Sequence, residues 1–214
     1  MEEIKTLIHQ WALDLGFQAV GYSNLDLSEH EDYLKTWLSN GFHGSMAYMN
    51  RNQALRISPS HLLTGSISAI TLRLDYLPEK GHQRIRKTLE SKDIAYISRY
   101  ALGRDYHKVI RTKLKRLANQ INDYIDLQKL GPFYARACTD SAPILEKHLA
   151  EKSGLGWIGK NTLLLNQPSY NLESLVTTNR LPGRTDTLED VYDLRRDSRA
   201  VFVSILDVGL RDRS

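Results

Sequence analysis

The sequence predicts an α/β domain in which helices flank a mixed sheet. Segments with helical periodicity alternate along the chain with short runs of β-branched and aromatic residues, and this alternation is typical of α/β domains. The 214 residues suffice for one large domain with a proper core. Hydrophobic content of 41% and charged content of 25% lie near the averages of globular proteins, so the composition argues against a largely disordered chain.

The first 41 residues predict a helix, a strand and a second helix. Apolar side chains recur at three- and four-residue spacing over residues 2–15, and Gly16 stands where a helix C-cap belongs. The run "FQAVGYS" follows as a short strand. The run "HEDYLKTWLSN" predicts the second helix, which ends at Gly41.

The middle of the chain predicts strands and a long two-faced helix. Residues 66–78, "SISAITLRLDYLP", mix β-branched and aromatic residues and stop at Pro78, as expected of a core strand. The run "DIAYISRY" is a second strand candidate. A helix is predicted from Arg104 to about Leu127. It carries an apolar stripe of Val109, Leu114, Leu117, Ile121 and Tyr124, and a basic stripe of Arg104, Lys108, Arg111 and Lys115.

A strand "FYARACT", a helix "PILEKHLAEKS" and a strand "NTLLLN" complete the predicted domain near Asn166. All 12 lysines lie in residues 1–166, whereas residues 167–214 contain 7 of the 17 arginines. In this tail, "AVFVSILDVGL" predicts at most a lone strand, and "NRLPGRTDTLEDVYDLRRDSR" has no period that would bury a face. We therefore expect a domain over residues 1–166 and a divergent tail over residues 167–214.

The cysteine count and the charge limit the cofactors, partners and compartments. Cys138 is the single cysteine, which excludes an intrachain disulfide and a cysteine-built zinc or iron–sulfur site within these residues, and a cytoplasmic location is expected. No apolar run approaches the roughly 20 residues that span a bilayer, and the acidic start "MEEIKTLIHQ" differs from a signal peptide, so no membrane association is expected. A net charge of +4 and a pI near 9.1 suit a polyanionic partner.

Asp140 lies between a predicted strand and a predicted helix, and it has two interpretations. Pro143 favours a first helical turn, so Asp140 or Ser141 would cap that helix. Alternatively, the carboxyl group faces a ligand and donates a proton. Burial against an apolar cofactor would raise its pKa and the helix dipole would lower it, so both interpretations stay open.

The stretch "GLGWIGKN" predicts a tight glycine-rich turn. Gly154 suits a helix C-cap, Gly156 and Gly159 allow a close backbone approach, and Lys160 and Asn161 are hydrogen-bond donors. The stretch is neither a Walker loop nor a dinucleotide fingerprint, because the glycine spacing is wrong and the glycines follow a helix. A purely structural turn and a ligand-binding turn are both compatible with it.

Several motifs, taken together in their order and spacing, resemble epoxyqueuosine reductase. They include "NRNQALRISPSHLLTGSISAITLRLDYLP", "ISRYALGRDYHKVIRTKLKRLANQI" and "DSAPILEKHLAEKSGLGWIGKNTLLLN", of which "GRDYHKV" and "GLGWIGKNT" are the most specific parts. The resemblance runs from about residue 2 to Asn166, so it covers the N-terminal domain. It implies a cobalamin-binding fold similar to that of reductive dehalogenases, and an oxidoreductase that converts epoxyqueuosine to queuosine at the wobble position of tRNA.

The resemblance also implies roles for individual residues. Asp140 corresponds to the proton donor for the epoxide oxygen. Cobalamin contacts are implied at Arg56, Ser98, Asp140, Lys160, Asn161 and Leu164. From the residues alone, each of three positions also has a structural interpretation: Arg56 as a surface residue, Ser98 as a small strand residue and Leu164 as a core residue. No metal-ligating residue is predicted.

The basic stripe would suit the phosphates of a tRNA anticodon stem-loop, but a solvated helix face is the simpler interpretation of the same spacing. His107 is expected to be structural or a polar neighbour of the pocket.

The tail departs from the family. Family members continue into cysteine motifs that hold two 4Fe-4S clusters, whereas no cysteine follows Cys138 here. We expect either a truncated chain that is inactive alone, or a short version that takes electrons from a separate ferredoxin or flavodoxin. A different class of function is a cobalamin- or tRNA-binding module without catalysis.

Overall fold

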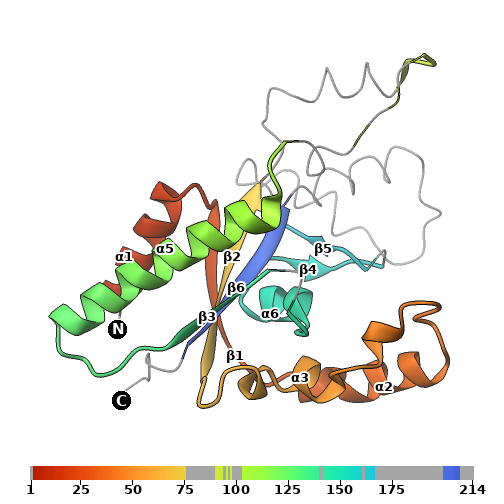
Figure 1. Cartoon of the computed structure of the whole chain (residues 1–214), viewed down its shortest axis with the longest axis horizontal. Helices are drawn as coiled ribbons and strands as arrows, with labels where there is room; N and C mark the ends of the chain where they lie inside the picture. The colour runs from red at the N-terminus through yellow and green to blue at the C-terminus, as the bar shows by residue number, and fades with distance from the viewer. Residues whose placement is uncertain are drawn as a thin grey trace, which may run out of the picture.

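A four-stranded sheet forms the centre of the fold in the computed structural model, with strand order β1-β2-β6-β3 (Figure 1). The structure describes residues 2–75, 90–93, 95, 97, 103–139, 142–160, 162–166 and 200–207, the last range by its backbone only. The helices are α1 (Glu2–Asp14), α2 (Glu31–Ser39), α3 (Gln53–Ile57), α5 (Tyr106–Leu127) and α6 (Glu146–Lys152), with 3-10 helices η1 (Ser28–His30), η2 (Ala47–Met49) and η3 (Pro59–His61). The strands are β1 (Ala19–Asn24), β2 (Ser68–Asp75), β3 (Ala135–Cys138), β4 (Trp157–Ile158), β5 (Leu164–Leu165) and β6 (Ala200–Asp207).

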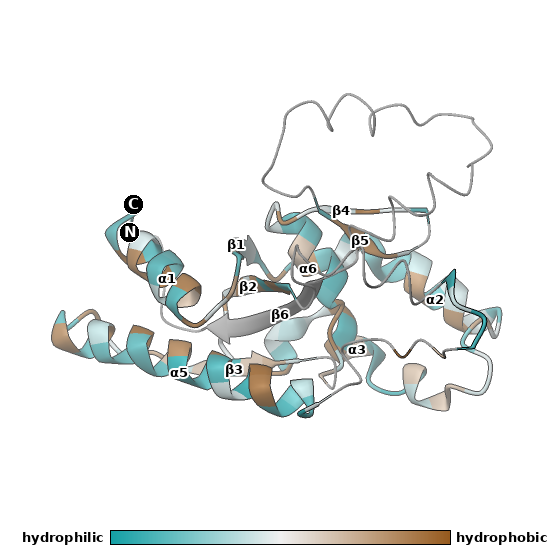
Figure 2. Cartoon of the chain, turned by 90° about the horizontal axis from the view of Figure 1, so that it is seen from above, coloured by the Kyte–Doolittle hydropathy of each residue, from teal (hydrophilic) through white to brown (hydrophobic). Residues whose placement is uncertain are grey.

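Helices cover both faces of this sheet (Figures 1 and 2). On one face, Leu114 of α5 belongs to a core cluster with Ile70 and Leu72 of β2, to which α1 also contributes. On the other face, Leu149 of α6 lies in a second cluster with Ala69. Consecutive side chains of a strand point to opposite faces, so Ala69 and Ile70 assign the two clusters to opposite sides of β2.

Most of the elements predicted from periodicity are confirmed. The helices α1, α2 and α5 and the strands β1, β2 and β3 lie where the sequence places them. On α5, Leu114, Leu117 and Ile121 are fully buried, while Val109 and Tyr124 are half-buried at the margins of the apolar stripe. Figure 2 shows the hydrophilic and hydrophobic residues that alternate along this helix. No helix within the described ranges is long and apolar enough to cross a membrane.

The expected mixed sheet is wrong for the part of the chain that the structure describes, where every strand pairing is antiparallel. The strands β2 and β3 do run in the same direction, as a strand-helix-strand crossover through α5 requires. They are not neighbours, however, because β6 lies between them and is antiparallel to both. The parallel pair that the alternating pattern predicts is therefore split by a third strand.

The strand β6 also corrects the interpretation of the tail. Its sequence predicts at most a lone strand outside the domain, yet β6 pairs along the whole of β2, from Ser68 opposite Asp207 to Asp75 opposite Ala200. Its other edge pairs with β3. A segment beyond residue 166 thus contributes a central strand to the sheet of the preceding residues.

Two further predictions differ from the structure or fall outside it. In the glycine-rich stretch, Trp157 and Ile158 form β4, which pairs with β5 in a short hairpin, so this stretch is more than a turn. In "DIAYISRY", the described residues Asp93, Ala95 and Ile97 are not in a strand, and the remaining residues lie outside the described ranges.

Candidate cofactor site and basic helix face

Three of the six residues expected at a cofactor site can be located. Arg56 lies on α3, Lys160 at the tip of the β4–β5 hairpin and Leu164 on β5. The other three, Ser98, Asp140 and Asn161, lie outside the described residues.

Arg56 is half-buried, and its Nε atom is buried without a hydrogen-bond partner among the described residues. A buried guanidinium N–H that lacks an acceptor is energetically unfavourable, and a bound anion or carbonyl group would satisfy it. The contact of Arg56 with a cofactor stays a prediction.

Leu164 is a core residue, as the structural interpretation predicts. Its side chain is 4% exposed and packs with Ala150 of α6, Leu155 and Ile158. The side chain therefore anchors the hairpin to α6.

The turn of the hairpin presents Lys160 to solvent. Its backbone is closed by two hydrogen bonds: Gly159 N donates to Leu163 O at 2.9 Å, and Thr162 N donates to Gly159 O at 2.9 Å. Lys160 is exposed between these bonds. The expected close approach of a glycine is confirmed at Gly156, where a Cβ atom would lie 2.0 Å from the carbonyl oxygen of Leu165.

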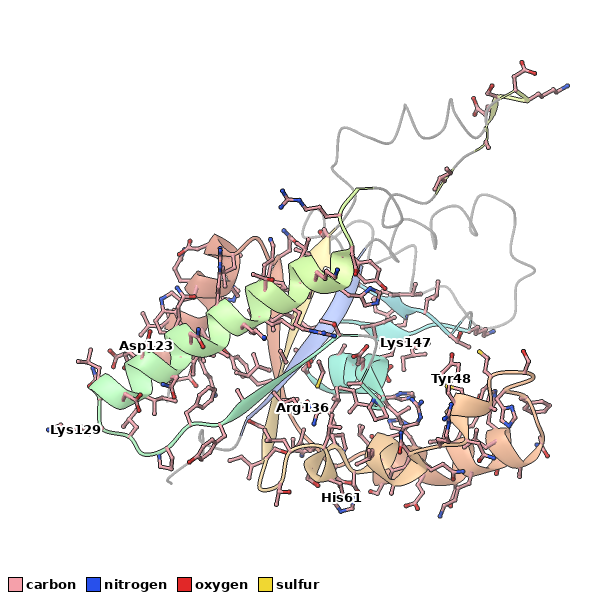
Figure 3. All side chains as sticks on the ribbon, viewed as in Figure 1. Tyr48, His61, Asp123, Lys129, Arg136 and Lys147 are labelled. Atoms are coloured by element: carbon pink, nitrogen blue, oxygen red, sulfur yellow. The ribbon has the colours of Figure 1, made fainter. Side chains whose placement is uncertain are left out.

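The helix α6 holds this hairpin by two side chains, a pair of contacts that we call the hairpin clamp. Lys147 Nζ donates to Thr162 O at 2.6 Å, and Glu151 Oε1 accepts a hydrogen bond from Ile158 N at 2.8 Å. Figure 3 labels Lys147 on α6 near the hairpin. Sequence reasoning missed both residues, because each has the charge and spacing of a solvated helix position.

The C-terminal end of α6 contacts the N-terminal part of the chain. Lys152 Nζ donates to Asp26 O at 2.5 Å. At Gly21 of β1, a Cβ atom would lie 2.5 Å from Ser153 O, so this position admits glycine only. The helix thus connects β1 to the hairpin.

The structure bears on Asp140 through the start of α6. The N-cap position of this helix is Leu145, which makes no side-chain cap, and Glu146 is the first helical residue. Pro143 therefore precedes the first helical residue. Asp140 and Ser141 lie outside the described residues, so both interpretations of Asp140 stay predictions.

Cys138 is an unreactive core residue at the end of β3. Burial, and then the charge of Glu146, raise the pKa of its thiol to about 12, so the neutral thiol predominates at neutral pH. Within the described ranges, no group of three or more His, Cys, Asp or Glu side chains could hold a metal ion.

The predicted basic stripe is exposed at Arg104, Lys108, Arg111 and Lys115, although Arg104 precedes the helix, which begins at Tyr106 and not at Arg104 as predicted. Beside it, an open depression is lined by Arg104, Asp105, Lys108, Val109, Thr112, Lys113 and Arg116. The stripe therefore extends to Arg116, which sequence reasoning missed although its spacing from Lys108 and Thr112 is helical.

The N-terminus of α5 is fixed by Asp105, which caps the helix. Its Oδ1 atom accepts from His107 N at 3.0 Å and lies 3.1 Å from His107 Nδ1. The hydrogen bond from the His107 side chain lowers the pKa of the Asp105 carboxyl group. His107 thus has the structural role that the sequence allows for it.

Comparisons with known proteins agree with the motifs. Residues 56–141 match the family model "Epoxyqueuosine reductase QueG, DUF1730". The chain is 51% identical over 160 residues to the epoxyqueuosine reductase of Pseudomonas aeruginosa, covering 75% of this chain and 42% of that protein. It is 45% identical over 167 residues to the Escherichia coli enzyme, covering 78% of this chain and 42% of that protein. The chain thus spans less than half the length of these relatives.

Solved structures share the fold. The epoxyqueuosine reductase from Streptococcus thermophilus superposes with a TM-score of 0.67 at 21% identity, over 96% of this chain and 46% of that one. An epoxyqueuosine reductase bound to an epoxyqueuosine-modified tRNA-Tyr stem loop gives a TM-score of 0.66 at 18% identity, over 97% of this chain and 46% of that one. A Bacillus subtilis enzyme, described with its catalytic aspartate loop swung out of the active site, gives 0.64 at 17% identity, over 100% of this chain and 47% of that one.

The motifs, the sequence relatives and the shared fold together identify this chain as a member of the epoxyqueuosine reductase family that corresponds to less than half of the length of its relatives.

Proposed function

We propose that this chain is an epoxyqueuosine reductase-like protein, which reduces epoxyqueuosine to queuosine in the wobble position of tRNA. The observation that carries this proposal is the 51% identity over 160 residues to the Pseudomonas aeruginosa enzyme. The family match over residues 56–141 also contains Arg56, Ser98 and Asp140, three of the residues implied at the site.

For the cofactor we propose cobalamin, held by Arg56, Ser98, Asp140, Lys160, Asn161 and the hairpin that Leu164 anchors. The buried, unpartnered Nε of Arg56 and the exposed ammonium group of Lys160 fit a ligand that carries a phosphate and many carboxamide groups. When bound, cobalamin would supply the reducing electrons through its cobalt.

For the proton we propose Asp140. Conversion of an epoxide to an alkene and water consumes two electrons and two protons, and a carboxylic acid beside the epoxide oxygen protonates it as the C–O bond breaks. A Bacillus subtilis enzyme of the same fold is described with an aspartate in its catalytic loop, which is compatible with this proposal.

The electrons must come from outside these 214 residues, because their single cysteine cannot ligate a 4Fe-4S cluster. We propose a separate donor such as a ferredoxin or flavodoxin. The same observation favours a second candidate, a cobalamin- or tRNA-binding module that does not turn over.

For the tRNA we propose that Arg104, Lys108, Arg111 and Lys115 contact phosphates of the anticodon stem-loop. Exposed cations on one helix face position a nucleic acid through its backbone. The stem loop bound by a relative of the same fold supports this partner.

An anaerobic titration of the 214-residue chain with cob(II)alamin tests the cofactor. A saturable base-off visible spectrum supports it, and a folded chain with no spectral change contradicts it. Adding an epoxyqueuosine-containing stem loop and a low-potential chemical reductant then tests turnover, with queuosine detected by mass spectrometry. Binding without product supports the non-catalytic module.

The variant Asp140→Asn should keep cobalamin binding nearly intact and lose turnover, because the amide cannot donate the same proton. The matched control is Asp123→Asn, an exposed change on α5. Retained turnover in Asp140→Asn would remove Asp140 from the reaction; if the chain alone does not turn over, the same change is made in its Pseudomonas aeruginosa relative.

A further inference from the structure

We propose that Lys147 and Glu151 are positioning residues, which hold the β4–β5 hairpin so that Lys160 can reach the cofactor. This inference rests on the proposed function and deepens it, since it assigns the support of a site residue to two side chains that do not touch the cofactor themselves.

The hairpin clamp grips both sides of the turn. Glu151 binds the backbone N–H of Ile158, which precedes Lys160, and Lys147 binds the backbone carbonyl of Thr162, which follows it. Lys147 and Glu151 are four residues apart on α6, so they project from the same side of the helix. The backbone that carries Lys160 is thus fixed from both directions by one helix.

The hairpin needs such support because it has little stability of its own. Its strands β4 and β5 contain two residues each. An isolated two-stranded hairpin is marginal in water even when it is longer. The packing of Leu164 against Ala150 holds the base of the hairpin, whereas the clamp holds its turn.

Both contacts involve a charged group, which makes them stronger than hydrogen bonds between neutral groups. Glu151 is half-buried and its bond to Ile158 is partly shielded from water, whereas Lys147 is exposed. We therefore expect Glu151 to contribute more than Lys147. An exposed lysine such as Lys160 has many rotamers, so a fixed backbone is what limits the volume that its ammonium group samples.

The test is an anaerobic cob(II)alamin titration of the full 214-residue chain and four variants. Glu151→Leu and Lys147→Met each remove one arm of the clamp. Glu151→Gln keeps an oxygen that accepts the Ile158 N–H. Lys152→Met is the matched control, because Lys152 lies on the same helix and donates to Asp26 O, away from the hairpin. Thermal melts and hydrogen exchange at the hairpin amides accompany each titration.

We expect Glu151→Leu to raise the Kd for cobalamin by about tenfold or more, as removal of an outer supporting group does at metal sites. Lys147→Met should have a smaller effect in the same direction. Glu151→Gln and Lys152→Met should bind within about twofold of the unchanged chain. Faster exchange at the hairpin amides in Glu151→Leu should accompany the weaker binding.

Wild-type affinity in both Glu151→Leu and Lys147→Met would overturn the inference and leave the proposed function intact. Equal weakening in Lys152→Met, or no recovery in Glu151→Gln, would also overturn it, since the cause would then be the packing of α6. If the unchanged chain gives no spectral response, the cofactor assignment fails and the inference fails with it. If Glu151→Leu does not fold, Lys147→Met decides the result.

Discussion

The imidazole rings of His30 and His148 stack with their centroids 3.9 Å apart and their planes inclined by 51°. The contact joins η1 to α6. Burial, and then the charge of His30, lower the pKa of His148 to about 4. Nearby charged groups on the two elements are Glu29, whose Oε1 lies 3.5 Å from His30 Nε2, and Lys147 and Glu151 on α6. The His148 ring is therefore neutral at neutral pH, and its contact with His30 packs η1 against α6.

The first prediction is a loss of stability between pH 6.5 and 4. The pKa of His148 falls from its usual 6.5 to about 4 in the folded chain, so the unfolded chain binds more protons in this range. The contribution of neutral, packed His148 to the free energy of unfolding is fully present above pH 6.5 and is lost as pH falls toward 4. We expect about 1 to 2 kcal/mol, because solvent screens a half-buried ring.

Urea unfolding at several pH values measures this effect, and His148→Phe is the comparison because it keeps an aromatic ring without a titrating group. An unchanged pH dependence in His148→Phe would show that other groups cause it.

The second prediction concerns Gly156. An alanine there would place its Cβ atom 2.0 Å from Leu165 O, so the two strands of the hairpin would have to separate. We expect Gly156→Ala to cost about 1 to 3 kcal/mol, as overpacking does, and to weaken cobalamin binding. Gly154→Ala is the comparison, since its φ of 76° also strains an alanine but a Cβ atom there meets nothing within 4 Å. A larger loss in Gly156→Ala than in Gly154→Ala therefore reports the contact with Leu165 O. Wild-type urea unfolding and binding in Gly156→Ala would contradict the described hairpin.

The third prediction separates RNA binding from general charge. Lys108→Ala should weaken binding of the tRNA stem loop and reduce the slope of log K against log salt concentration by about 0.7 to 0.9, which corresponds to one lost phosphate contact. Lys129→Asn is the control, because Figure 3 shows Lys129 beyond the far end of α5. Equal losses in both variants, measured by fluorescence anisotropy, would indicate non-specific attraction instead.

The fourth prediction is that residues 1–166 do not fold as a separate unit. Without β6, both β2 and β3 would expose unpaired backbone groups at the centre of the sheet. We expect a fragment ending at Asn166 to show no cooperative thermal transition by circular dichroism, whereas the whole chain shows one. A cooperative melt of the fragment near that of the whole chain would contradict the central position of β6.

The sequence predicts those elements of the fold that depend on neighbouring residues, and it does not predict contacts between residues far apart in the chain. The helix α5 and the strand β2 follow from local periodicity, because a buried face repeats along the element itself. The central position of β6 does not follow from local periodicity, because the residues that pair, such as Asp75 and Ala200, are far apart in the sequence. The role of Asp140 stays a prediction, because Pro143 is only a local signal and the helix α6 begins three residues later, at Glu146.

The candidate site shows the same division. Arg56 and Lys160 are predicted from family motifs, and the basic stripe from helical spacing. Glu151 is not, because its bond to Ile158 N depends on how α6 meets the hairpin. The burial of Leu164 agrees with its apolar sequence pattern. The pattern does not indicate that this side chain packs the hairpin against α6.

The central position of β6 constrains how the chain acquires its structure during synthesis. Asp75 and Ala200 are neighbours in the sheet although 125 residues separate them along the chain. The nascent polypeptide must therefore emerge as far as Asp207 before the four-stranded sheet can close, and until then β2 and β3 present open edges. Aggregation of ribosome-bound intermediates is the expected consequence, and slow translation between β3 and β6 would prolong that exposed period.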